Sequence, residues 1–203
     1  MQSLIVAAHP SPNSFSAAMT QALAAEFAAL GHGVDVLDLY TEDFDPVIRQ
    51  NQFPLRADQD AFAVMTEQAH QAKTGSAGAD VRRSQALLTR ADNVVLQFPL
   101  WWWSLPAQMK GWVDRVLSAG FAYGGADLSG RRAMLAVVAE TKSEKFRAEG
   151  AEHPLHHIER GILKFCGFDV LPAFVAADIY ALGEEERRER LRDLRAHVRR
   201  AFG

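Results

Sequence analysis

Short apolar segments alternate with longer segments of helical composition along this chain. Residues 3–8, 94–100 and 133–139 are continuous apolar runs, which are typical of strands buried on both faces of a parallel sheet. Residues 34–39 alternate apolar and polar positions and predict a further strand, and residues 169–176 predict a fifth. The pattern therefore indicates five strands that are well separated in the sequence.

Helices are expected between and after these strands. Residues 14–30 are rich in Ala, Leu, Gln and Glu and begin with capping residues. Residues 106–117 and 156–165 have helical spacing of apolar positions, and the segment from Gly183 onward opens with three glutamates before its arginines. Residues 41–78 lack a strand period and predict loops and short helical pieces.

Strands that alternate with helices imply right-handed crossovers and a parallel sheet covered on both faces. For five strands we expect a flavodoxin-like, doubly wound α/β fold with strand order 2-1-3-4-5, in one domain over residues 1–203. In that arrangement ligands bind beyond the carboxyl ends of the first and third strands. The loops at those two positions are therefore where chemistry is expected.

Composition narrows the class of protein. The chain has 203 residues, 48% hydrophobic and 23% charged, which excludes disordered and fibrous classes. The net charge of -3 argues against a nucleic-acid-binding surface. The single cysteine, Cys166, allows neither an internal disulfide nor a thiolate zinc site and favours a reducing compartment, so a cytoplasmic location is expected.

Neither a membrane span nor a metal site is expected from the sequence. No apolar run approaches the roughly 20 residues that cross a bilayer, and the first residues lack the basic segment of a signal peptide. His153, His156 and His157 lie close together, but no carboxylate or thiolate pattern completes a ligand set.

The loop after the first strand reads HPSPNSFS over residues 9–16. It contains neither G-x-G-x-x-G nor a Walker lysine pattern, which excludes the common dinucleotide fingerprint and the P-loop. Asn13, Ser14 and Ser16 instead place amide and hydroxyl groups at a helix N-terminus, where free backbone N–H groups accept a phosphate. The alternative is that Asn13 or Ser14 only caps the helix.

The loop after the third strand holds three of the chain's four tryptophans in a row, in QFPLWWWSLP over residues 97–106. Adjacent side chains cannot share one face of a regular element, so at least one ring is expected to point toward the strand ends and a planar aromatic ligand. Packing in the core or at a dimer interface is the alternative. Together, the two loops suggest a phosphorylated planar heterocycle such as a flavin nucleotide.

Four segments carry a family resemblance: AHPSPNSFS at 8–16, DLYTEDFDPV at 38–47, QFPLWWWSLPAQMKGWVDRV at 97–116 and GILKFCGFDVL at 161–171. On these the chain resembles the flavodoxin-like NAD(P)H:quinone reductases. That group includes DT-diaphorase, the MdaB-type reductases and the ancillary flavoproteins of potassium efflux systems.

The resemblance implies FAD as cofactor, with FMN as the alternative, and NAD(P)H as co-substrate. Phe15 and Ser16 would lie nearest an adenine if FAD is bound. One of the three tryptophans would also face the nicotinamide and the quinone, and Trp102 is the candidate with a catalytic role. The implied cofactor-binding residues are His9, Asn13, Ser14, Phe15, Ser16, Pro99, Leu100, Trp101, Trp102, Trp103 and Thr141.

The chain departs from this family after the fourth strand. Relatives commonly have Thr-Thr-Gly-Gly there, followed by a tyrosine and a histidine. Here residues 139–143 read AETKS, followed by Phe146 and His153. Lys142 is a candidate for positive charge beside the reduced flavin and His153 for the proton donor, although either residue type is also common on a solvated surface. Cys166 lies in an apolar stretch and is expected to be buried rather than nucleophilic.

The expected function is a homodimeric flavoprotein that takes a hydride from NAD(P)H and reduces a quinone or a similar acceptor by two electrons in a ping-pong cycle. The resemblance also implies that sites lie at the dimer interface, to which residues 41–78 would contribute. Two alternatives stay open. One is an ancillary subunit of a potassium efflux system, which would associate with a membrane through its partner, and the other is an azo- or nitro-compound reductase or an FMN reductase.

Overall fold

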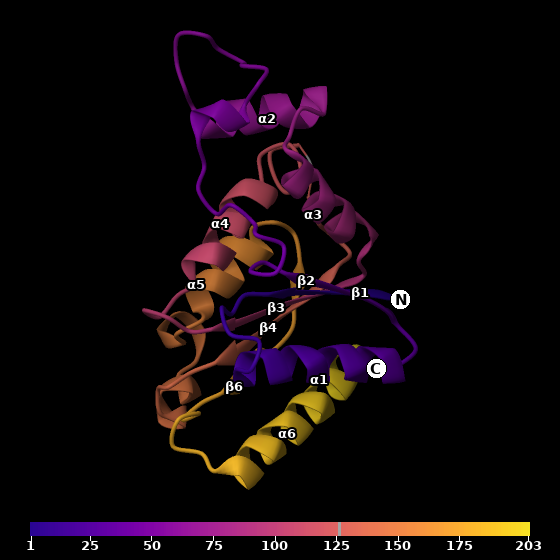
Figure 1. The fold of residues 1–203 in the computed structure, drawn as a ribbon, viewed down its shortest axis with the longest axis vertical. Helices are drawn as coiled ribbons and strands as arrows, with labels where there is room; N and C mark the ends of the chain where they lie inside the picture. The colour runs from indigo at the N-terminus through magenta and orange to yellow at the C-terminus, as the bar shows by residue number, and fades with distance from the viewer. Residues whose placement is uncertain (126) are drawn as a thin grey trace.

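The computed structural model describes residues 1–125 and 127–203 and contains a parallel β-sheet between two layers of helices (Figure 1). The strand order is β2-β1-β3-β4-β5, with β6 also paired to β4, which confirms the predicted flavodoxin-like order. The strands are β1 Gln2–Ala7, β2 Gly33–Asp38, β3 Asn93–Pro99, β4 Arg132–Val138, β5 Asp169–Val170 and β6 Phe174–Ala176.

The helices also follow the expected alternation. They are α1 Phe15–Ala29, α2 Val64–Thr74, α3 Ala79–Arg90, α4 Ala107–Val116, α5 His156–Ile158 and α6 Glu184–Phe202. A π-helical turn, η4 Glu159–Lys164, continues α5, and 3-10 turns are η1 Gln50–Gln52, η2 Ser143–Arg147 and η3 Gly150–Glu152. The sequence pattern did not predict α3, whose buried face is short and includes a serine, Ser84.

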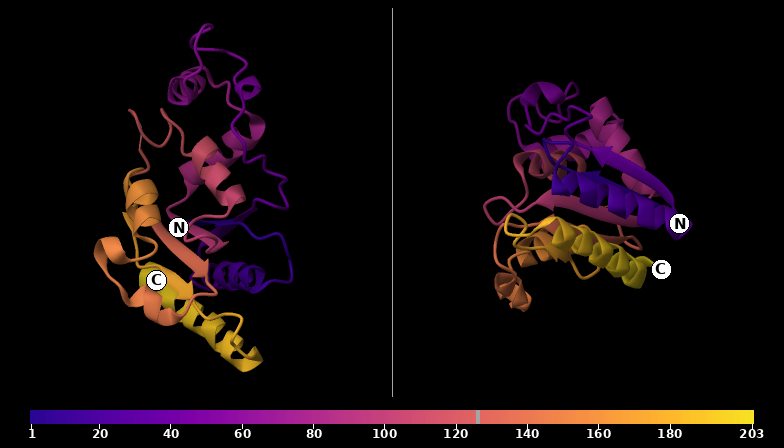
Figure 2. Two further views of the ribbon diagram at one scale, coloured as in Figure 1. Left: turned by 90° about the vertical axis from the view of Figure 1, so that its left-hand side faces the viewer. Right: turned by 60° about the horizontal axis from the view of Figure 1, so that its bottom comes forward.

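Helices α1 and α6 cover one face of the sheet, and α3, α4 and α5 cover the other (Figures 1 and 2). The alternation of side chains along β1 explains this arrangement. Leu4 and Val6 pack with Trp112 of α4, whereas Ile5 packs with Met19 of α1 on the opposite face. Because both faces of the sheet are buried, polar and apolar residues do not alternate along β1. Helix α2 lies apart from these layers and projects from the far end of the molecule (Figure 1).

The predicted fifth strand, residues 169–176, is wrong as one continuous strand. It is divided into β5 and β6, which both pair with β4. Between the two, the register against β4 shifts by one residue, from Ala133 with Val170 to Ala136 with Phe174. Pro172 lies in this interruption and has no N–H to donate to a ladder, which explains a bulge at this point.

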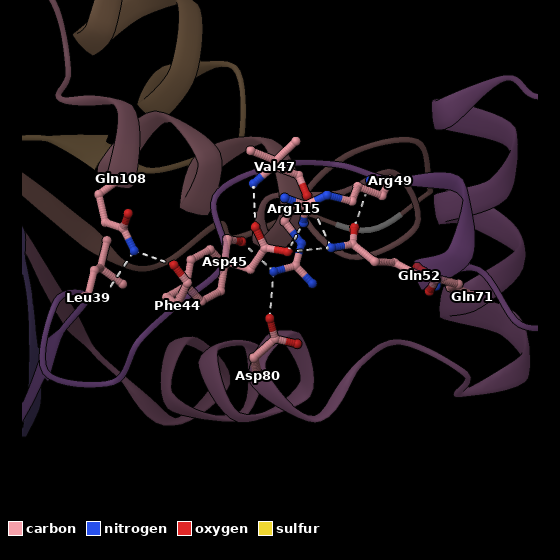
Figure 3. A network of polar contacts seen from close by, with 10 residues as sticks. All are labelled: Leu39, Phe44, Asp45, Val47, Arg49, Gln52, Gln71, Asp80, Gln108 and Arg115. Atoms are coloured by element: carbon pink, nitrogen blue, oxygen red, sulfur yellow. Dashed lines mark hydrogen bonds and ion pairs between the residues drawn. The ribbon is translucent and has the colours of Figure 1, made fainter.

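A polar network fastens the segment after β2 to α4 (Figure 3). The buried guanidinium of Arg115 donates to the carbonyl of Asp45 at 2.6 Å and to Oδ2 of Asp80 at 2.5 Å. Gln108 Nε2 donates to the carbonyls of Leu39 and Phe44. These contacts hold the chain close to the carboxyl end of β2.

Candidate active site

The loops after β1 and β3 meet at the carboxyl edge of the sheet and line one cleft of about 320 Å³, here called the strand-end cleft. Parallel strands end at the same edge of the sheet, so two loops that are distant in sequence become neighbours. Eight of the predicted cofactor residues line this cleft: His9, Asn13, Ser14, Phe15, Ser16, Pro99, Leu100 and Trp101.

The N-terminus of α1 opens into the strand-end cleft. Ser14 caps the helix, because its Oγ accepts from the amide of Ala17 at 3.1 Å. The amides of Phe15 and Ser16 belong to the first turn and have no intrahelical acceptor. Ser16 is 2% exposed, and its Oγ has no hydrogen-bond partner among the described residues. This end of the cleft therefore offers donors to an acceptor-rich group such as a phosphate.

The three tryptophans form a tight turn at the end of β3. Trp101 and Ser104 exchange two backbone hydrogen bonds, at 3.3 and 3.0 Å, and the two residues between them have φ of 51° at Trp102 and 58° at Trp103. This is the geometry of a type I′ turn. The exposed fractions are 41%, 97% and 48% in chain order, so none of the three rings packs in the core of the chain.

A second hollow, of about 410 Å³, adjoins the tryptophan turn. Its lining residues are Leu100, Trp101, Trp102, Trp103, Glu140 and Thr141. We call it the tryptophan hollow. Because Leu100, Trp101 and Glu140 line both depressions, the hollow is continuous with the strand-end cleft. The combined site has a phosphate-binding end at α1 and aromatic surface at its other end, which fits a flavin nucleotide.

Two of the predicted catalytic residues lie outside these linings. Lys142 is exposed and precedes η2. His153 lies behind Phe146: their ring centroids are 6.3 Å apart, and Phe146 is 6.4 Å from Trp103. Nδ1 of His153 accepts from the amide of Leu155 at 3.2 Å. Trp102 and Thr141, by contrast, both line the tryptophan hollow. The catalytic roles of Lys142, His153 and Trp102 stay predictions.

The sequence interpretation missed several residues of the strand-end cleft. Tyr180 and Arg187 line it from the segment before α6 and from the first turn of that helix. Arg187 Nη2 donates to the carbonyl of Ile179 at 3.2 Å, which holds the guanidinium beside the cleft. In the sequence Arg187 is one of many arginines in a charged helix, so no local signal distinguishes it. Glu140, directly after β4, was assigned no role.

Other reactive groups do not contribute to this site. Cys166 is 3% exposed, and burial raises the pKa of its thiol to about 11, which confirms that it is an inert buried residue. Within residues 1–125 and 127–203, no group of three or more His, Cys, Asp and Glu residues is arranged to hold a metal ion. In the same part of the chain, no helix combines the length and apolarity needed to cross a bilayer.

Comparison with known proteins assigns this chain to a family. The model of the flavodoxin-like fold family matches residues 1–201, and the chain belongs to that family. The mouse ribosyldihydronicotinamide dehydrogenase [quinone] is 33% identical over 198 residues, covering 91% of this chain and 85% of the mouse protein. The rat NAD(P)H dehydrogenase [quinone] 1 is also 33% identical, over 90% of this chain and 69% of the rat protein.

Solved structures agree with these relatives. A proposed quinone reductase from Klebsiella pneumoniae has a TM-score of 0.91 at 30% identity and covers 98% of this chain and 83% of its own. An NAD(P)H:quinone oxidoreductase from Methanothermobacter marburgensis has a TM-score of 0.80 at 26% identity, with coverages of 97% and 93%. The resemblance stated from the sequence motifs is thereby confirmed.

Proposed function

We propose that this protein is an NAD(P)H-dependent flavoprotein that reduces quinones or related acceptors by two electrons in a ping-pong cycle. One observation carries the proposal: two adjoining depressions connect donors at the α1 N-terminus, which have no partner among the described residues, with the exposed tryptophan turn. Relatives that are 33% identical over about nine tenths of the chain are named as quinone dehydrogenases, which supports the same activity.

The chain's own contribution is binding and orientation. A bound flavin supplies the group that accepts a hydride from one substrate and passes it to the next. The amides of Phe15 and Ser16 would hold its phosphate, and Leu100 and Trp101 would lie against its ring, since all four residues line the strand-end cleft. The exposed ring of Trp102 would face the two substrates in turn. Lys142 would supply positive charge beside the flavin and His153 would be the proton donor, although neither residue lines the strand-end cleft or the tryptophan hollow in this structure.

FAD is the proposed cofactor, with FMN as the alternative. The strand-end cleft extends past the phosphate-binding end of α1 to Tyr180 and Arg187. An aromatic ring and a guanidinium at that position suit the adenine and the second phosphate of FAD, which FMN lacks. Chromatography of the flavin released from the purified protein distinguishes the two.

We further propose that residues 1–203 form one domain that acts as a homodimer in the cytoplasm. An apolar groove of about 540 Å³, lined by residues of α2, α4 and η4, supports the dimer. Met65 and Phe165 in this groove are each 63% exposed. Exposed apolar surface of this kind marks an interaction site, and α2 belongs to the segment expected at the interface.

The test is an anaerobic absorption spectrum of the purified protein. NADPH, and separately NADH, should bleach a flavin band, and a soluble quinone should restore it. A panel with azo and nitro compounds as acceptors separates quinone reduction from the alternative activities. If no flavin band forms after incubation with FAD or with FMN, the proposed function is wrong.

Ser16 provides a residue-level version of this test. Ser16→Ala removes the buried hydroxyl that has no partner among the described residues. We expect flavin affinity to fall by about tenfold, the usual worth of one hydrogen bond to a charged group. Ser76→Ala is the control, because the Ser76 hydroxyl lies at the end of α2 and bonds to Thr74. Equal flavin affinity in the two variants would contradict a phosphate at Ser16.

A further inference from the structure

A separate cleft lies on the other side of the loop after β1, between α1 and the end of β2. It has a volume of about 370 Å³, and its polar lining includes Ser11, Thr20, Gln21, Asp38, Thr41 and Gln97. We call it the β2 cleft. It shares only His9 and Ser11 with the strand-end cleft, and the proposed flavin chemistry uses none of its other residues.

A buried amide in this cleft lacks a partner. Gln97 is 0% exposed, and its Oε1 accepts from Oγ1 of Thr20 at 3.1 Å. Its Nε2 has no hydrogen-bond partner among the described residues. The opposite orientation of the amide does not remove the problem. Nε2 could then donate to Oγ1 of Thr20, whose hydroxyl would donate to the carbonyl of Ser16 at 3.2 Å. In that orientation Oε1 of Gln97 would be the atom without a partner. Buried amides are almost always paired, so this group indicates a missing polar partner.

The β2 cleft also has a carboxylate, because Asp38 and Gln97 are both in register with Ala7 and lie on the two strands that flank β1. Asp38 is the last residue of β2, and its Oδ1 accepts from the amides of Tyr40 and Thr41 at 3.0 and 3.3 Å. Its Oδ2 has no hydrogen-bond partner in the described part of the chain. One oxygen of Asp38 therefore stabilises the turn after β2, and the other stays available to a ligand.

These groups select a chemical class. A hydroxyl group satisfies Gln97 in either orientation of its amide, since a hydroxyl both donates and accepts. A carboxylate accepts from hydroxyl donors, and its charge disfavours phosphate and other anions. In dinucleotide-binding folds an acidic residue about 20 positions after the glycine motif binds a ribose hydroxyl; this chain lacks that motif, so only the carboxylate–hydroxyl chemistry carries over. We propose that the β2 cleft binds an uncharged ribose-type sugar through its vicinal diol, between Asp38 and Gln97.

Titration with methyl β-D-ribofuranoside, followed by NMR, tests this proposal on the full chain. Its 2-deoxy analogue, which lacks the vicinal diol, should bind about tenfold more weakly, the loss of about one hydrogen bond. Asp38→Asn should weaken riboside binding to a similar extent. This variant keeps an oxygen for the amides of Tyr40 and Thr41, so the turn is preserved. Asp60→Asn makes the same chemical change at an exposed position outside the cleft and should leave binding unchanged.

Gln97→Met tests the buried amide independently: riboside binding should weaken in this variant, and circular dichroism confirms that it folds. The proposal is wrong if the two ribosides bind equally, if Asp38→Asn binds like Asp60→Asn, or if no riboside binds. It is also wrong if a crystal soaked with the riboside shows only water at Gln97. Repeating the titration with saturating FAD and FMN must leave riboside binding intact. A chain that binds no flavin would overturn the proposed function, while the riboside titration would still decide this inference.

Discussion

At the residue scale, Trp102 and Trp103 have backbone conformations that cost free energy, and packing within the chain does not offset this cost at Trp102. Type I′ turns favour Asn and Gly, because both central residues have positive φ. Larger L-residues lose about 1–2 kcal/mol each in that region. Trp102 is 97% exposed, so packing within the chain does not offset the cost. Such strain is typical of functional sites, and it supports a role for the ring in contacting a ligand or partner.

Trp102→Gly should separate stability from activity. Glycine relieves the strain at positive φ, so we expect the free energy of unfolding to rise by about 1 kcal/mol. The value of kcat/KM for quinone reduction should fall because the ring is absent. Trp102→Ala is the matched control: it loses the ring but keeps a Cβ at positive φ, so its stability should not rise. Urea denaturation and steady-state kinetics measure both effects, and a less stable glycine variant would contradict the argument.

His32 is a residue whose protonation opposes folding. Its ring stacks on Phe27, with centroids 5.5 Å apart, and its Nδ1 lies 2.9 Å from Oγ of Ser3. Burial lowers the pKa of His32 from its ordinary value, and the positive charges of the N-terminus and of Arg132 lower it further. The unfolded chain therefore binds a proton at His32 more readily than the folded chain does.

The stability contribution of neutral His32 should be complete above about pH 6.5, the ordinary histidine pKa, and should be lost as the pH falls toward the lower pKa of the folded state. His32→Gln should therefore flatten the decline of the urea midpoint between neutral and mildly acid pH. His157→Gln, which removes an exposed histidine instead, tests whether the change is specific to the stacked ring. An identical decline in His32→Gln and in the unmodified protein would refute the assignment.

At the element scale, α4 determines where the chain runs after β2. A Cβ at Gly111 would lie 2.1 Å from the carbonyl oxygen of Pro46, so only glycine allows this backbone to pass so close to the helix. Arg115, one turn further along, hydrogen-bonds the carbonyl of Asp45 beside it (Figure 3). Close approach and hydrogen bonding thus act together at one short contact, which holds Asp45 and Pro46 against α4.

Gly111→Ala should destabilise the protein despite the higher helix propensity of alanine. Overpacking of this kind costs about 1–3 kcal/mol, and here the obstruction is backbone that cannot rotate away. Gly161→Ala is the control, since a Cβ there meets nothing within 4 Å and a helical glycine-to-alanine change is neutral or stabilising. Thermal unfolding of the two variants gives the comparison, and equal melting temperatures would show that the contact is not tight.

At the scale of the whole molecule, two surfaces have different characters. The carboxyl edge of the sheet has the polar and aromatic clefts. The groove between α2, α4 and η4 is mainly apolar, and α2 extends away from the sheet (Figure 2). A helix that projects from the domain with exposed apolar side chains is suited to contact with a second copy of the chain.

Met65→Glu and Phe165→Glu should shift the proposed dimer to monomers, because each variant places a charge in the apolar groove. Sedimentation equilibrium measures the change. Val36→Glu replaces an apolar side chain that is 45% exposed outside the groove and should leave the assembly unchanged. A monomeric unmodified protein, or a dimer that both groove variants preserve, would rule out this interface.

Sequence patterns predicted most of the fold because hydrophobic periodicity reports burial directly. Four strands were expected one residue later than they occur, and the helix that begins at Phe15 was placed correctly by its cap at Ser14. The interruption at Pro172 was missed, because a proline in an apolar segment marks a bulge only when the partner strand is known. Helix α3 was missed because its short buried face includes Ser84.

By itself, the sequence determined the element order, the parallel sheet, the two strand-end loops and the family, since all of these depend on local periodicity and contiguous motifs. Tertiary structure alone decided that Arg187 and Tyr180 line the strand-end cleft, that His153 lies next to Phe146, and that Gln97 and Asp38 line a second cleft. The physical reason is distance along the chain. These neighbours are tens of residues apart in most cases or separated by a turn, and only the packing of helices on the sheet brings their side chains together.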